Sequence, residues 1–141
     1  MVDVLMLAKY LIDSCTKEKH PITYQKLQLM LYVIQMYWLQ EKQKELFQDA
    51  ILAYQYGPGV ERINTLYKEF KEIPLRFRYD TSFSVLTAEE LEEINQIRLQ
   101  LRDTYPITDS ENFLNFRSPW YSTYYASGDG SIIDTMTMIM G

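Results

Sequence analysis

The chain has one histidine and one cysteine, the side chains that most often serve as catalytic base and nucleophile. His20 lies in the polar run TKEKHP, and Cys15 lies on the apolar side of a helical pattern. A triad of nucleophile, histidine and acid could use only His20. A single cysteine also excludes a zinc site built on several thiolates. We therefore interpret His20 as a solvated loop residue and Cys15 as a small buried hydrophobe.

Four glutamates form an acidic run at the start of a predicted helix, at positions 89, 90, 92 and 93. Glu89 and Glu93 share a helix face. They could form a docking patch for a basic protein, or contribute to a metal-dependent hydrolase site. The sequence favours a simpler interpretation, a solvated helix start that interacts well with the helix dipole. Nowhere do a nucleophile, a base and an oxyanion site come together, so we expect no catalytic residue, no cofactor and no enzyme.

Aromatic and methionine residues near the end of the chain are candidates for binding a protein partner. Tyrosine and tryptophan are enriched at interface hot spots, and thioethers suit adaptable surfaces. Core packing is the alternative for each group. We expect Pro119 and Trp120 to form a structural corner. The candidate partner-binding residues of this segment are Tyr121, Tyr124, Tyr125, Met136 and Met138.

Composition indicates one globular domain spanning residues 1–141. The chain is 47% hydrophobic and has a net charge of −5. The acidic balance argues against a general nucleic-acid binder, which needs a basic face. The most apolar region, residues 27–39, is interrupted by Gln28 and Gln35 and is too short to span a bilayer. We therefore expect a cytoplasmic protein without a membrane partner; its oligomeric state is left open.

Hydrophobic periodicity predicts a mainly α fold with a small β element, built around a central apolar helix. Asp3 caps a helix that runs to about Ser14, and Thr23 opens the apolar helix that runs to about Glu41. Thr87 and Glu90 form a capping box for a third long helix. We expect Pro106 to end that helix, and Thr108 or Asp109 to cap a short one that runs to Phe116.

Alternation from Ala50 to Tyr56 predicts a strand, and Tyr56, Gly57 and Pro58 then form a sharp turn. Pro58 is expected in the first turn of an amphipathic helix over residues 60–70. The turn is either an anion site or a structural joint, and we favour the joint, which would aim that helix onto the central one. Residues 75–79 alternate again, so we expect a two-stranded sheet with the 50–56 strand. Residues 131–141 fit a strand or a short helix.

Three stretches in this order resemble the Panacea family, which includes the SocA-like antitoxins and many phage-associated proteins. They are ITYQKLQLMLYVIQMYWL, LFQDAILAYQYGPGVERINTLYKEF and FLNFRSPW, within a resemblance that covers residues 4–120. Several positions depart from the family pattern. Gly59 is inserted before Val60, and Gln28 replaces a lysine-like residue. Asn115 stands at the usual histidine, and Arg117 near a usual acid.

The resemblance implies a single domain that neutralises a toxin by direct contact in the cytoplasm of a bacterium or of a phage-infected bacterium. The partner would then be a toxin encoded nearby. Two alternatives stay among binding proteins: a phage-borne inhibitor of a host defence protein, and an adaptor that delivers a toxin to a protease. A metal-dependent hydrolase is the remaining alternative from a different class.

Overall fold

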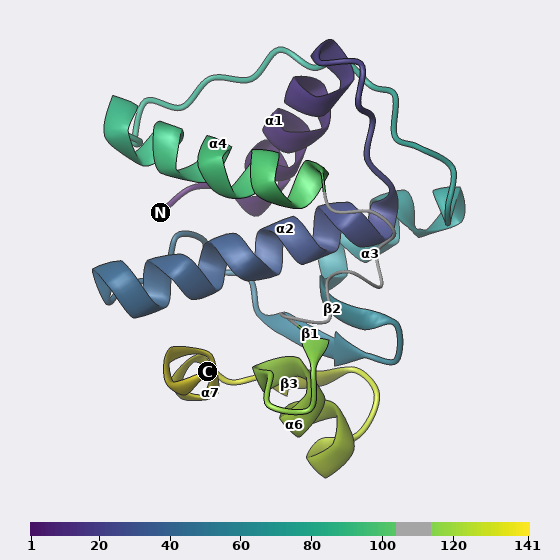
Figure 1. Cartoon of the computed structure of the whole chain (residues 1–141), viewed down its shortest axis with the longest axis vertical. Helices are drawn as coiled ribbons and strands as arrows, with labels where there is room; N and C mark the ends of the chain where they lie inside the picture. The colour runs from purple at the N-terminus through teal and green to yellow at the C-terminus, as the bar shows by residue number, and fades with distance from the viewer. Residues whose placement is uncertain (104–113) are drawn as a thin grey trace.

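The computed structural model describes residues 1–103 and 114–141, and three long helices dominate the first of these ranges (Figure 1). They are α1 (Val4–Lys17), α2 (Tyr24–Tyr37) and α4 (Ala88–Arg102). Each begins at its predicted cap. The side chains of Asp3 and Thr23 accept hydrogen bonds from backbone amides of the first turn. Thr87 and Glu90 form the reciprocal capping box, because each satisfies an amide that the helix itself cannot.

Helix α2 is the centre of the core, as its apolar sequence predicts. Most of its residues are buried, including the polar Gln28 and Gln35. In Figure 1 it runs between α1 and α4 on one side and the sheet on the other. The helix continues into a π-helical turn, η1 (Trp38–Lys42), whose C-cap, Gln43, is left-handed. The predicted mainly α fold with a small β element is confirmed.

The sheet has three antiparallel strands rather than the two that we predicted. They are β1 (Ile51–Tyr54), β2 (Gly57–Val60) and β3 (Ser131–Ile133), in the order β2-β1-β3. Ile51 pairs with both Val60 and Ile133. The third strand comes from the C-terminal segment, which was ambiguous in the sequence because it contains a strand followed by a short helix, α7 (Thr135–Met140).

Two local predictions around the turn are wrong. Pro58 lies inside β2, and helix α3 (Glu61–Tyr67) begins three residues later, followed by the 3-10 turn η2 (Lys68–Phe70). A proline is tolerated here because β2 is an edge strand. Residues 76–80 form no strand, and Leu75 makes only one bridge, to Ile22. The alternation in 75–79 arises because this segment lies along α1 instead.

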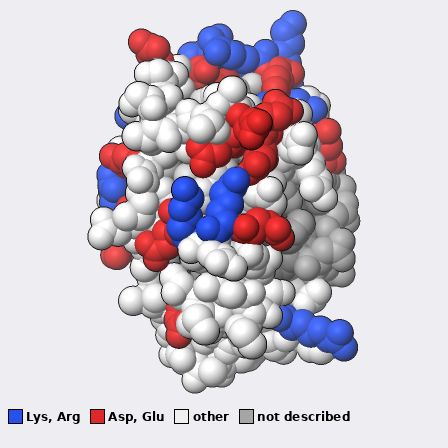
Figure 2. Space-filling view, turned by 90° about the vertical axis from the view of Figure 1, so that its left-hand side faces the viewer, with Lys and Arg blue, Asp and Glu red and all other residues white. Residues whose placement is uncertain are grey.

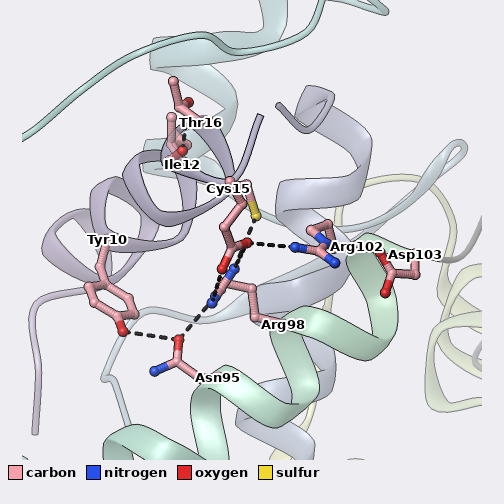
Figure 3. Close-up of polar contacts among 9 residues, drawn as sticks. Tyr10, Ile12, Cys15, Thr16, Asn95, Arg98, Arg102 and Asp103 are labelled. Carbon is pink, nitrogen blue, oxygen red and sulfur yellow. Dashed lines mark hydrogen bonds and ion pairs between the residues drawn. The ribbon is translucent and has the colours of Figure 1, made fainter. Parts of the chain in front are cut away.

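Ion pairs attach that segment and α4 to α1. The buried Asp13 accepts hydrogen bonds from Arg78 Nε at 2.7 Å and from the Tyr79 amide at 2.9 Å. On the neighbouring helix, Arg98 donates to both oxygens of Glu18 at 2.5 and 3.0 Å. Figure 3 shows Arg98 reaching from α4 towards α1, with Cys15 and Asn95 nearby. These contacts hold three segments that are distant in the sequence against one another.

Helix α6 (Pro119–Ser127) follows the Pro-Trp corner, with Ser118 as its N-cap and Pro119 at its first position. Its Trp120 indole donates to the Tyr54 carbonyl at 2.7 Å, which ties the corner to the sheet. The structural role of Pro119 and Trp120 stays a prediction. The predicted helix end at Pro106 and the predicted cap at Thr108 or Asp109 lie outside the described residues.

Candidate partner-binding surface

The acidic run on α4 and the methionines of α7 both lie next to η1. Lys42 Nζ lies 3.0 Å from Glu93 Oε2, and the Gln40 amide donates to the Met138 carbonyl at 2.9 Å. Helix α7 packs on η1. Figure 2 shows the face of the molecule that lies on the left-hand side of Figure 1. Acidic and basic side chains gather on its upper and middle parts, and its lower part is largely uncharged. The π-helical turn therefore places a charged region beside an uncharged one.

The acidic run is not a set of four free carboxylates. Glu90 is the N3 residue of the capping box, and Glu93 is half-buried and pairs with Lys42. The hydrogen bond from Lys42 to Glu93 raises the pKa of the lysine, which also lies 5.1 Å from the Trp38 ring centroid. Glu89 is exposed. Of the two acids singled out in the sequence, Glu89 is available to a partner and Glu93 is engaged in the fold.

The three tyrosines of α6 also differ in how accessible they are to a partner. Tyr124 stacks on Trp120 with ring centroids 5.8 Å apart, so it supports the corner. Tyr125 is 66% exposed, and its ring centroid lies 4.3 Å from that of the half-buried Tyr121. Tyr121 and Tyr125 form a partly exposed aromatic pair, and rigid aromatic side chains offer contact area to a partner at a low cost in conformational entropy. Tyr121 and Tyr125 therefore remain the accessible part of the tyrosine cluster.

The methionines of α7 point in opposite directions. Met138 is only 2% exposed and packs in the core, whereas Met136 is 62% exposed.

The segment 118–141 contains no lysine or arginine and two aspartates. Its strongly exposed apolar residues, which we call the C-terminal apolar residues, are Tyr125, Ile132, Met136, Ile139 and Met140.

The turn at Tyr56 and Gly57 contains a hydrogen-bond network that the sequence pattern did not reveal. Gly57 has a φ of 141°, which favours glycine. The Tyr56 hydroxyl contacts that of Tyr24 in α2, and Tyr24 donates to Asn64 Oδ1 in α3 at 2.5 Å. Burial and the Tyr24 hydrogen bond raise the pKa of Tyr56, so the phenol stays neutral. The turn is thus a joint that fixes α2 relative to α3.

Two of the departures from the family pattern contact each other. Gln28 accepts from the Val60 amide at 2.9 Å and donates to the Val60 carbonyl at 3.1 Å. A Cβ on Gly59 would lie only 3.0 Å from Gln28 Nε2. The glycine therefore gives the glutamine room to bond the β2 backbone. In the sequence, the available signals for this contact were a glutamine within the apolar helix and, much later in the chain, an extra glycine before Val60.

The other two departures, Asn115 and Arg117, are exposed. Asn115 Oδ1 accepts from the Arg117 amide at 2.9 Å, and the guanidinium lies 5.2 Å from the Phe116 ring centroid. Both residues line a groove of about 510 Å³ beside α2 and α4. Both side chains are therefore solvent-accessible while they make local contacts within the chain.

The residues first considered for catalysis are linked through the backbone, since the His20 amide donates to the Cys15 carbonyl at 2.9 Å, but their side chains lie in different surroundings. Cys15 is buried, and burial raises the pKa of its thiol; His20 is exposed at the end of α1. Within residues 1–103 and 114–141, no group of three or more histidine, cysteine, aspartate or glutamate side chains is placed to hold a metal ion. In the same ranges, none of the helices has the length and apolar character needed to cross a membrane.

Comparison with known proteins agrees with the resemblance seen in the sequence. The family model described as "Antitoxin SocA-like, Panacea domain" matches residues 27–127, well over half of the chain. No curated protein and no solved structure matches it. The matched region contains most of α2, the β1–β2 hairpin, α3, α4 and the Pro-Trp corner, whereas α1, β3 and α7 lie outside it. The chain therefore belongs to the family of SocA-like antitoxins with a Panacea domain.

Proposed function

We propose that this protein is an antitoxin that neutralises a toxin by direct protein–protein contact and has no catalytic activity of its own. The observation that carries the proposal is the family match over residues 27–127. The toxin would be encoded nearby, and both proteins would act in the cytoplasm of a bacterium or of a phage-infected bacterium.

The C-terminal apolar residues support a role in binding. Scattered exposed apolar side chains are normal on a protein surface. Here, however, five large ones lie within a segment that has no basic residue and two aspartates. Such a surface suits an apolar partner segment flanked by lysine or arginine, because opposite potentials favour encounter. Glu89, on α4, is a separate exposed acidic residue.

The proposal is tested by growth rescue. Each short gene next to the coding sequence is expressed alone in a bacterial host, and then together with this chain. We expect one gene product to arrest growth, and the chain to relieve the arrest and to co-purify with that product. Failure to rescue, together with failure to bind any neighbouring product, contradicts the proposal.

Variants locate the contact surface. Tyr125→Ala and Met136→Glu change exposed residues, so we expect folding to be unchanged and affinity for the toxin to fall at least about tenfold, as for hot-spot residues. Glu89→Gln should slow association and weaken its salt dependence. Gln96→Ala, an exposed change on the same helix as Glu89, is the control. Equal affinity of all variants would show that the toxin binds elsewhere.

A host that lacks its major cytoplasmic proteases separates occlusion from delivery. Rescue that persists in this host supports neutralisation by occlusion. Rescue that is lost there supports the adaptor role.

A further inference from the structure

A groove of about 900 Å³ opens where the β1–β2 turn meets the start of α2 and the turn that follows α3. This volume is in the range of ligand pockets, roughly 300–1,000 Å³. Nothing described so far uses the groove. Its lining includes three apolar side chains and three polar ones, Phe70, Ile73, Pro74, Tyr24, Tyr56 and Asn64.

The hydrogen bonds behind the groove fix which polar atoms face a ligand. Val60 bonds both ends of the Gln28 amide, so Gln28 Nε2 is the donor to the Tyr24 hydroxyl, at 3.3 Å. Tyr24 gives its own proton to Asn64 Oδ1. Tyr56 must therefore donate to Tyr24. This leaves an acceptor on the Tyr56 oxygen and a donor on the Asn64 amide nitrogen.

The Tyr56 oxygen and the Asn64 amide nitrogen have no other hydrogen-bond partner among the described residues. The side chains around them are held in place by packing and hydrogen bonds. The hydroxyl of the buried Tyr24 is fully used, and its ring lies 5.7 Å from that of Tyr56. The Tyr54 ring stacks on the Tyr56 ring, with the ring centroids 5.3 Å apart and an angle of 10° between the ring planes. A donor and an acceptor held in this way recognise a group that can both accept and donate, such as a phenol.

The turn that forms the apolar side of the groove is strained. Lys71 has φ 50° and ψ −113°, the first central position of a type II′ turn, and the Ile73 amide donates to the Phe70 carbonyl at 2.8 Å. That position is dominated by glycine, asparagine and aspartate, and a lysine there is unfavourable. The turn nevertheless places Phe70 and Ile73 beside the polar pair. The charged residues at the groove are two lysines and two glutamates, Lys68, Lys71, Glu69 and Glu72.

We propose that the groove receives an uncharged aromatic side chain with a hydroxyl group, a tyrosine of the partner protein, which packs on Phe70, Ile73 and Pro74 and hydrogen-bonds Tyr56 and Asn64. The balance of charges at the groove favours an uncharged group. Tyrosine is enriched among interface anchors that fill such pockets. The assignment to a partner protein rests on the proposed function, whereas the preference of the groove for a phenol does not.

The preference is tested with two probes and the full chain. N-acetyl-L-tyrosinamide and N-acetyl-L-phenylalaninamide differ by one hydroxyl group. We expect both to cause saturable shifts of the Asn64 and Ile73 backbone amide resonances. The tyrosine probe should bind at least about fivefold more tightly, because each of its two neutral hydrogen bonds contributes about 1 kcal/mol, which is about fivefold in affinity.

Variants show whether the named atoms cause the difference. Tyr56→Phe and Asn64→Ala should each lower the affinity for the tyrosine probe about fivefold, the effect of one hydrogen bond, and leave the affinity for the phenylalanine probe nearly unchanged. Tyr125→Phe removes an exposed phenol outside the groove and is the control. Should Tyr56→Phe fail to fold, Asn64→Ala and the comparison of the two probes on the unmodified chain decide the matter. No saturable shift, or equal affinity of the two probes, overturns the inference.

The rescue assay separates the inference from the proposed function. If the unmodified chain rescues growth, Asn64→Ala should weaken toxin binding, and unchanged binding overturns the assignment of the groove to the partner. Probe binding by a chain that does not rescue contradicts the antitoxin proposal and supports the phenol preference of the groove.

Discussion

At the scale of single residues, buried polar side chains carry much of the specificity of this fold. Gln28 is a buried polar residue of the largely apolar α2 and bonds both backbone groups of Val60. Gln35 does the same for the segment that leads into β1, accepting from the Leu46 amide at 2.8 Å and donating to the Phe47 carbonyl at 2.8 Å. Since buried backbone groups need partners, these two amides determine where the chain passes over α2.

Gln28→Leu should lower the free energy of unfolding by about 2 kcal/mol, because the Val60 amide and carbonyl lose their buried partner. Urea denaturation followed by circular dichroism measures this change. Gln96→Leu, an exposed change in α4, should stay within about 0.5 kcal/mol of the unmodified chain. An equal effect of the two substitutions would show that the Gln28 bonds do not contribute.

Asp13 predicts a dependence of stability on pH. Burial raises the pKa of this carboxyl, but hydrogen bonds from Arg78, the Tyr79 amide and Lys17 outweigh it, so the pKa lies below its ordinary value of 3.8. A lowered pKa in the folded state stabilises the fold above the ordinary value, and this stabilisation is lost as the pH falls through the lowered pKa.

Asp13→Asn should therefore cost about 2 kcal/mol at pH 7, the scale of a hydrogen bond to a charged group. The difference from the unmodified chain should shrink once the pH falls below 3.8. Urea unfolding at a series of pH values tests this. Asp80→Asn, an exposed neighbour of the same segment, is the matched control. A difference that is constant over the whole pH range would refute the explanation.

At the scale of elements, short turns rather than long helices place the surfaces. The π-helical η1 contacts both α4, through Lys42 and Glu93, and α7, through Gln40 and Met138, and a π-helical turn is often found at a functional position. The type II′ turn after η2 directs the chain from α3 back along α1. Its backbone is unfavourable for the lysine present, so the surrounding contacts must impose it.

Lys71→Gly should raise the free energy of unfolding by about 0.5–1 kcal/mol, because glycine adopts the positive φ without strain. Lys68→Gly, in the preceding 3-10 turn, should lower it by a similar amount, about 0.5–1 kcal/mol, through the greater entropy of the unfolded chain. Thermal or urea denaturation compares the two. If both substitutions destabilise the protein equally, the turn at Lys71 is not strained.

At the scale of the whole molecule, the C-terminal segment completes a sheet that begins much earlier in the chain. Strand β3 pairs with β1, and the Trp120 indole bonds the Tyr54 carbonyl. These contacts connect residues 119–141 to the core built by α2. That the chain is a single domain stays a prediction, which these contacts make testable.

We therefore expect one cooperative unfolding transition. Trp38 lies in η1 and Trp120 in α6, so Trp120→Phe and Trp38→Phe variants give fluorescence signals from one region each. The two signals and far-ultraviolet circular dichroism should give the same midpoint in urea, as for a two-state domain. An earlier transition of the Trp120 signal in the Trp38→Phe variant would show that the C-terminal segment unfolds separately.

The sequence by itself determined the elements whose signals are local. Caps at Asp3, Thr23 and Thr87 and the apolar pattern of residues 27–39 specify three helices and the buried centre, because capping and helical periodicity act within a few residues. The ordered stretches also identified the family. Which of the predicted contact residues are accessible was not determined, since Tyr121 and Tyr124, or Met136 and Met138, have the same residue type.

Only the tertiary structure decided the remaining features. Alternation in residues 75–79 is compatible with a strand, yet no strand forms because β1 already pairs on both edges, with β2 and β3. The engagement of Glu93 by Lys42 and the Tyr24–Tyr56–Asn64 network join residues far apart in the chain, and Pro58 lies in an edge strand because β3, from the C-terminal segment, pairs on the other side of β1. Such contacts depend on how the segments fold over α2, and a local pattern contains no information on that arrangement.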